Sequence, residues 1–63
     1  MSKLKETRAN RHMTQAELAD SSGVSVRMIQ KYEQGDRDIN KAQGSTLFSL
    51  AKALECQIED ILE

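Results

Sequence analysis

The chain has 63 residues, 30% of them charged, with three glycines and no proline, a composition that predicts one small, helical domain over residues 1–63. It has no apolar run near the roughly 20 residues that cross a bilayer and no signal-peptide pattern, so we expect no membrane role. The net charge is −1, and the single cysteine, Cys56, cannot form an internal disulfide, which is typical of a cytoplasmic protein.

The first helix is expected over residues 2–10, where Leu4 and Arg8 recur on an inner face at helical spacing. Residues 11 and 12 connect it to a second helix over residues 15–21. Thr14 is a favourable N-cap for that second helix, and Glu17, three residues later, completes a capping box. The second helix therefore has a marked start.

A turn at Gly23 separates the second helix from a third over residues 26–34, because glycine adopts a positive φ at little cost. Ser25 is placed to cap this third helix, and Gly35 to end it. Ile29 and Tyr32 recur at helical spacing and are expected to face the core. The opposite, outward positions are Val26, Arg27, Gln30 and Lys31.

A polar loop over residues 36–41 follows, with Ile39 as its expected anchor in the core. The fourth helix, residues 43–54, is predicted to bury one apolar stripe at helical spacing. The members of this stripe are Leu47, Leu50, Ala51 and Leu54. Phe48 is interpreted as a core or groove filler, like Met13 and Met28, or as part of a seam between two copies.

A fifth, short helix is expected over residues 58–62, with Glu59 and Asp60 in its first turn, where the helix dipole favours acids. Its apolar side chains exceed what so short a helix usually buries alone. The candidate seam of a homodimer therefore consists of Ile58, Ile61 and Leu62.

Charge is distributed unevenly along the chain. Eight of the nine Lys and Arg residues precede Ala42, together with six of the ten acids. Because attraction to an anion depends on the facing surface and not on the total charge, we expect a basic face from the first two-thirds of the chain. The acidic C-terminal part is expected to face away from it.

Nothing in the residue pattern indicates catalysis. His12 is the single histidine and Cys56 the single cysteine, so the sequence offers no supported nucleophile–base pair and no His and Cys set for a metal. The carboxylates are scattered over the predicted helix surfaces. We expect no enzyme activity, no metal and no cofactor.

Residues 14–35 resemble the helix-turn-helix domain of phage repressors and Cro proteins and of the xenobiotic-response-element class of bacterial regulators. The small Ala19, the turn glycine Gly23 and the trailing Tyr-Glu-Gln-Gly of residues 32–35 fall where that motif places them. So do the apolar positions Leu18, Val24, Ile29 and Tyr32. The resemblance extends over nearly all of the chain and implies a compact, five-helix, all-α lambda-repressor-like domain that binds double-stranded DNA.

The resemblance also implies roles for particular residues. Val26, Arg27 and Lys31 are implied to read base edges, with Gln30 beside them: arginine pairs with guanine, and valine packs on a thymine methyl. Backbone phosphates are implied to meet the N-terminus of the second helix. The implied phosphate contacts are Thr14 and Gln15, and Ser25 at the start of the third helix is a similar candidate; Arg37 and Lys41 are further candidates because they are cations in the polar loop and not because of the resemblance. Arg8 and Glu33 are implied to form a structural salt bridge.

The expected function is that of a sequence-specific transcriptional regulator, a repressor, that binds a palindromic operator as a homodimer with residues 26–34 in the major groove. One such module covers only about 600–1,000 Å² of protein surface, which two copies on adjacent half-sites double. The alternative is a protein-interaction module, such as an antitoxin bound to a toxin, with DNA binding secondary. The net acidic charge keeps this alternative open.

Overall fold

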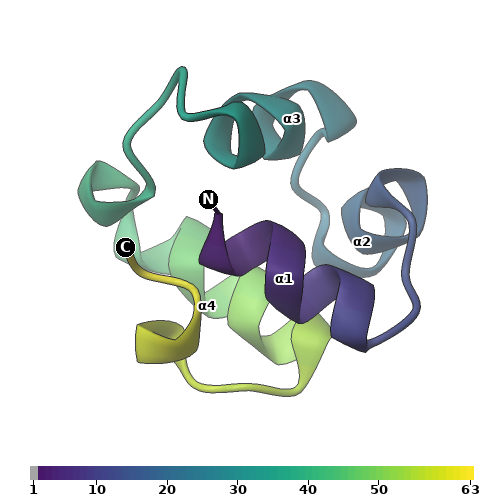
Figure 1. The fold of residues 1–63 in the computed structure, drawn as a ribbon. Helices are drawn as coiled ribbons and strands as arrows, with labels where there is room; N and C mark the ends of the chain where they lie inside the picture. Colours follow the sequence, from purple (N-terminus) through teal and green to yellow (C-terminus); the bar gives the residue numbers. More distant parts are fainter. Residues whose placement is uncertain (1) are drawn as a thin grey trace.

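Four α-helices follow one another in the predicted order in the computed structural model, which describes residues 2–63. They are α1 (Lys3–Asn10), α2 (Gln15–Ser22), α3 (Val26–Gln34) and α4 (Gly44–Leu54), with 3₁₀ helices at Ile39–Lys41 and Ile58–Asp60 and no strand in these residues. The predicted all-α fold is confirmed. α2 packs against both α3 and α4, and α3 lies across the molecule from the turn at residues 58–60 (Figure 1).

Side-chain caps set the starts of the first three helices. The hydroxyl of Ser2 accepts a hydrogen bond from the backbone N–H of Lys5 at 3.1 Å. Thr14 accepts from the N–H of Glu17 at 3.0 Å, and the Glu17 carboxylate accepts from the N–H of Thr14 at 2.8 Å, so the predicted capping box is complete. Ser25 caps α3 in the same way. These caps explain why the predicted boundaries of α1, α2 and α3 agree with the structure to within one residue.

Gly23 and Gly35 end α2 and α3 in the left-handed conformation, with φ of +79° and +81°. A side chain at either position meets no atom within 4 Å, so the backbone conformation alone requires glycine there. Gly23 turns the chain from α2 directly into the cap of α3. The crossing of the two helices therefore depends on this residue.

Alanine substitutions at two glycines are expected to change stability in opposite directions. Gly23→Ala should lower the free energy of unfolding by about 1–2 kcal/mol, because alanine is strained at a left-handed φ. Gly44→Ala, at the start of α4, should raise it by about 0.4–1 kcal/mol, because alanine restricts the unfolded chain and fits the helix. Urea unfolding followed by circular dichroism measures both changes, and a loss of similar size in both variants contradicts the backbone explanation.

All four α-helices contribute side chains to the core. Ile39 of the first 3₁₀ helix and Ile61, which follows the second 3₁₀ helix, contribute as well. Its fully buried side chains are Leu4, Leu18, Ile29, Leu50, Leu54 and Ile61. The stripe predicted for α4 is buried as expected, and Ile39 is 3% exposed, so it anchors the loop between α3 and α4 as predicted. This core fixes α3 by Ile29 and Tyr32 and leaves its opposite face to the solvent.

The C-terminal segment differs from the prediction. In place of a helix over residues 58–62 there is a single 3₁₀ turn, Ile58–Asp60, in which the N–H of Ile61 bonds to the carbonyl of Ile58 at 3.0 Å. Such i to i+3 bonds are common where a segment is too short to extend an α-helix. Ile61 is wholly buried in the core, so it cannot belong to a seam between copies. Ile58 and Leu62 are partly exposed.

The interpretation of Phe48 as a core filler is also wrong. Its side chain is 60% exposed, because the buried stripe of α4 passes through Leu47 and Leu50, and the next residue after Leu47 lies about 100° around the helix. The Nζ of Lys52, one turn along, lies 5.9 Å from the centre of the Phe48 ring. Phe48 therefore remains available to contact another molecule.

The loop between α3 and α4 is joined to the C-terminal residues by side-chain hydrogen bonds that were not predicted. Asn40 donates from Nδ2 to the carbonyl of Glu63 at 3.1 Å and accepts from the Glu63 N–H at 2.8 Å. The Glu63 carboxylate accepts from the backbone N–H of Lys3 at 2.7 Å. The loop is thus held beside the start of α1.

No helix described in residues 2–63 has the length and apolar character that a membrane crossing requires.

Candidate nucleic-acid interface

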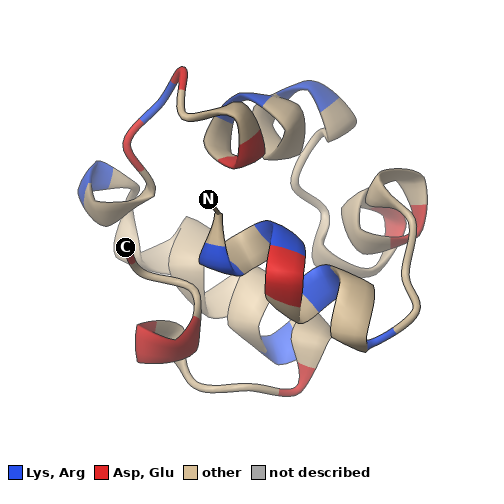
Figure 2. Cartoon of the chain, in the orientation of Figure 1, with Lys and Arg blue, Asp and Glu red and all other residues tan. Residues whose placement is uncertain are grey.

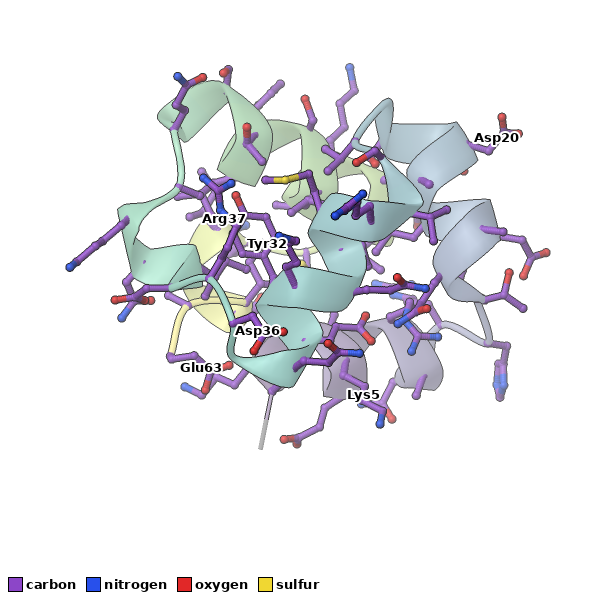
Figure 3. The ribbon with its side chains drawn as sticks, turned by 90° about the horizontal axis from the view of Figure 1, so that it is seen from above. Lys5, Asp20, Tyr32, Asp36, Arg37 and Glu63 are labelled. Carbon is purple, nitrogen blue, oxygen red and sulfur yellow. The ribbon has the colours of Figure 1, made fainter. Side chains whose placement is uncertain are left out.

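The outward face of α3 is open to solvent. Arg27 and Gln30 are exposed, and Val26 and Lys31 are partly exposed. On the opposite side of the helix, Ile29 is fully buried and Tyr32 is 7% exposed. Figure 3, which looks down on α3, shows this helix in front of the rest of the fold. None of the four predicted base readers is covered by the domain itself, so a groove can receive them.

The N-termini of α2 and α3 carry three of the predicted phosphate contacts. Thr14 and Ser25 are exposed, and each hydroxyl oxygen accepts a bond from a backbone N–H of its own helix. The hydroxyl hydrogen stays free to donate, so capping does not prevent a phosphate contact. Gln15, the first residue of α2, is partly buried, and its amide is bonded within the protein. Helix N-termini attract anions through their unbonded N–H groups and the helix dipole.

Two further predicted phosphate contacts, Arg37 and Lys41, lie in the segment after α3, and both are exposed. The Nη1 of Arg37 donates to the sulfur of Met28 at 3.7 Å, which brings this guanidinium back to α3. Figure 3 shows Asp36 at the end of α3 and the Arg37 side chain alongside the helix, near Tyr32. Lys41 is the last residue of the 3₁₀ helix Ile39–Lys41. The backbone of Arg37 thus follows the C-terminal end of α3, whereas its guanidinium reaches back to Met28 in the first turn of that helix.

Arg8 and Glu33 form a two-pronged ion pair between α1 and α3. The Nε of Arg8 donates to one carboxylate oxygen of Glu33 at 2.7 Å and Nη2 donates to the other at 3.0 Å. A third donor, Nη1, bonds the carbonyl of Met13 at 2.7 Å. The Arg8 side chain is 13% exposed and the Glu33 side chain 3%. The pair thus lies beneath the outward face of α3 and ties that helix to α1 and to the connection before α2.

Positive charge lines the outer edge of α3, while exposed acids lie on α2, in the loop after α3 and in the C-terminal turn. Figure 2 shows Lys and Arg along the outer edge of α3 and Asp and Glu in the turn at residues 58–60. The C-terminal acids are not all remote, because Glu63 reaches back to the start of α1. The outward side of α3 carries Arg27 and Lys31 and no acid, so this strip suits a polyanion although the net charge is −1 and Asp36 and Asp38 follow in the loop.

Comparison with protein families yields one match. The helix-turn-helix family model matches residues 4–61 of the chain. The chain belongs to the helix-turn-helix family. Members of this family are DNA-binding transcriptional regulators and are not typically enzymes. No curated protein and no solved structure matched the chain.

Gln15 has a role in this helix-turn-helix domain that the sequence did not reveal. Its Nε2 donates to Glu33 at 3.0 Å, and its Oε1 accepts from the Nε2 of Gln30 at 3.3 Å. Gln15 is 15 positions from Gln30 and 18 positions from Glu33 in the sequence. The crossing of α2 and α3 brings it beside both residues. The sequence shows only that a glutamine stands at the first position of α2. A glutamine there predicts a contact at the surface and gives no indication of a bond to a buried carboxylate.

Acid is expected to destabilise the helix-turn-helix domain through Glu33. Burial favours a higher pKa for Glu33, but hydrogen bonds from Arg8 and Gln15 and the charges of Arg8 and Lys5 together lower that pKa. Because the folded-state pKa is below the unfolded value of about 4.3, this stabilisation is complete above that pH. It is lost as the pH falls through the folded-state pKa.

Urea unfolding at a series of pH values between neutrality and about 3 measures this effect. The wild-type free energy of unfolding should fall steadily below about pH 4.3. A variant that lacks the carboxylate, Arg8→Met with Glu33→Leu, should show a shallower decline. Equal declines in the two proteins assign the acid sensitivity to other carboxylates.

Proposed function

We propose that this helix-turn-helix domain is a cytoplasmic repressor that binds a palindromic operator as a homodimer, with α3 in the major groove. The observation that carries the proposal is the two-sided character of α3, where Arg27 and Gln30 are exposed opposite the buried Ile29. Arg27 pairs with O6 and N7 of guanine, and Val26 packs on a thymine methyl. Lys31, one turn further along, reads guanine or binds a phosphate.

Phosphate contacts on both sides of α3 fix its register on the duplex in this proposal. Thr14, Gln15 and Ser25 contact the backbone from the N-termini of α2 and α3, and Arg37 and Lys41 contact it from the loop. Such contacts position a protein but carry no sequence information. Because each lysine or arginine at a phosphate releases counterions, the affinity should fall steeply with salt.

The dimensions of the fold support the pairing of two copies on one operator. Its Cα atoms extend over 23 × 20 × 20 Å, whereas half-sites one helical turn apart are about 34 Å from centre to centre. With side chains added, two copies on one face of the duplex come close enough to touch. The partly exposed Ile58 and Leu62 remain candidates for the seam, and exposed Phe48 is the other.

Binding selection from random duplexes, with purified protein at two salt concentrations, tests the proposed function. The expected result is an inverted-repeat site with half-sites one helical turn apart and a marked loss of affinity at the higher salt concentration. Sedimentation at micromolar concentration, with and without the selected duplex, tests the dimer. Leu62→Glu and Phe48→Glu then identify the seam, and a persistent monomer on DNA removes the dimer from the proposal.

A second candidate function is partner binding, as in an antitoxin that holds a toxin, with DNA contact secondary. The exposure of Phe48 favours it, because the ring lies beside a hollow between α2 and α4 that is lined by Ser21, Ser22, Lys52 and their neighbours. Aromatic side chains bury a large area when they insert at a protein interface and dominate the energetics of such interfaces. Absence of any duplex binding at low salt favours this function over the first.

A further inference from the structure

Glu33, Gln15 and Gln30 form a chain of hydrogen bonds that leads from a buried ion pair to the outward face of α3. We call these three residues the relay. Gln15 donates to Oε1 of Glu33 at 3.0 Å, and Gln30 donates to Oε1 of Gln15 at 3.3 Å. Glu33 is held at the inner end by both prongs of Arg8, with its side chain only 3% exposed. Gln30, at the outer end, is exposed.

The chemistry of Glu33 fixes the direction of every bond in the relay. An ionised carboxylate accepts hydrogen bonds and donates none, so the amide nitrogen of Gln15 must face it. The amide oxygen of Gln15 then faces Gln30, which must turn its own nitrogen inward. Rotation of either amide by half a turn places two acceptors or two donors against each other. Gln30 therefore presents its amide oxygen and the second hydrogen of Nε2 to another molecule.

We propose that Gln15 is a positioning residue that holds Gln30 in the orientation needed to read adenine in the major groove. Adenine presents the N6 amino donor beside the N7 acceptor. The outward oxygen of Gln30 accepts from N6, and the Nε2 hydrogen that Gln15 does not use donates to N7. Guanine presents O6 and N7 and thymine presents O4, and these acceptors repel the Gln30 oxygen. The inference rests on the proposed function of α3 as the reading helix.

The relay improves discrimination because it removes the freedom of Gln30 to present either end of its amide. A free glutamine turns its nitrogen outward at little cost and then binds guanine or thymine. Restricting one long side chain before binding is worth about 2- to 10-fold in affinity. We therefore expect the preference for adenine over guanine at this position to fall by about that factor when Gln15 no longer bonds to Gln30.

Binding selection with three variants tests this effect. Gln30→Ala should remove a preference for adenine at one position of each half-site, which identifies the base that Gln30 faces. Gln15→Met keeps the length of the side chain without its hydrogen bonds, and it should weaken the preference at that same position and leave the preference due to Arg27 unchanged. Gln34→Met, a matched change at an exposed glutamine of α3 outside the relay, should alter neither preference.

The outcomes that overturn the inference are specific. A preference for guanine or thymine at the position that Gln30→Ala affects shows that the amide has the opposite orientation. An unchanged selection profile for Gln15→Met shows that Gln30 does not depend on Gln15. Circular dichroism of each variant establishes that the fold is intact before the profiles are compared.

Nuclear magnetic resonance of the free protein tests the relay without DNA. The side-chain amide signals of Gln30 should shift with acid titration of Glu33 in the wild type and lose that response in Gln15→Met. Unaltered Gln30 signals in Gln15→Met overturn the relay, whatever the protein binds. A relay that responds as expected in a protein that selects no DNA sequence shows instead that the proposed function is wrong and that adenine reading fails with it.

Discussion

Replacing Arg8 with alanine is expected to unfold the protein or to remove much of its stability. The variant leaves the Glu33 carboxylate, 3% exposed, without its cation and the carbonyl of Met13 without its 2.7 Å donor. Loss of one partner of a buried pair costs about 3–5 kcal/mol. A chain of 63 residues has a free energy of unfolding of only about 3–9 kcal/mol. Far-ultraviolet circular dichroism and urea unfolding measure the loss.

A double variant separates the role of the pair from the role of Arg8 alone. Arg8→Met with Glu33→Leu removes both charges and keeps much of the buried volume, so stability should recover to near the wild-type value. Gln15 and Gln30 then lose their anchor while the fold survives. A single Arg8→Ala variant that is well folded and has lost only DNA binding contradicts the structural role and makes Arg8 a contact residue.

The helices of this fold could be predicted because their ends are encoded locally. Thr14 and Glu17 complete a box within four residues, and Gly23 and Gly35 end helices with a φ that few other residues adopt. The face of α3 follows from the spacing of Ile29 and Tyr32, since 3.6 residues make one turn. The outward positions were therefore predictable from the sequence, although their contacts with DNA remain proposals.

Features that depend on several elements could not be predicted in this way. The burial of Ile61 is decided by how much space α1 and α4 leave, and its apolar character alone fits a core as well as a seam. The exposure of Phe48, in contrast, follows from the predicted stripe of α4, because Phe48 lies about 100° around the helix from Leu47. The pairing of Arg8 with Glu33 spans 25 residues, and only the family resemblance indicated it.

The relay through Gln15 and the bonds between Asn40 and Glu63 were missed for a similar reason. These hydrogen bonds join amide side chains to partners that lie 15 to 23 positions away in the sequence. Polar residues so far apart leave no periodic pattern that would predict the bond. Nothing in the sequence distinguishes a glutamine that binds a phosphate from one that bonds to a buried carboxylate. The distance across the crossing of α2 and α3 shows the bond to the carboxylate, and an amide nitrogen with two hydrogens can make the proposed phosphate contact as well.

Arg27→Ala is expected to abolish the preference for guanine at one position of each half-site and leave the fold intact. Arg27 is exposed on α3, so its removal opens no cavity. A bidentate pair with guanine contributes about 1–3 kcal/mol of discrimination, which corresponds to about a 5- to 150-fold loss of selectivity. Binding selection with the variant, at the two salt concentrations used for the wild type, measures the loss, and urea unfolding shows whether stability is retained.

Lys52→Ala is the matched control, because it removes one positive charge from α4, where Lys52 lies against Phe48 and away from the reading face. It should leave every base preference unchanged. A phosphate role for Arg27 predicts a different pattern, in which Arg27→Ala weakens binding to all sequences alike and reduces the salt dependence by about one counterion. The side chain carries the same charge in both roles, so only a loss of preference at a single base position distinguishes base recognition from a phosphate contact. That result decides whether α3 reads sequence through Arg27.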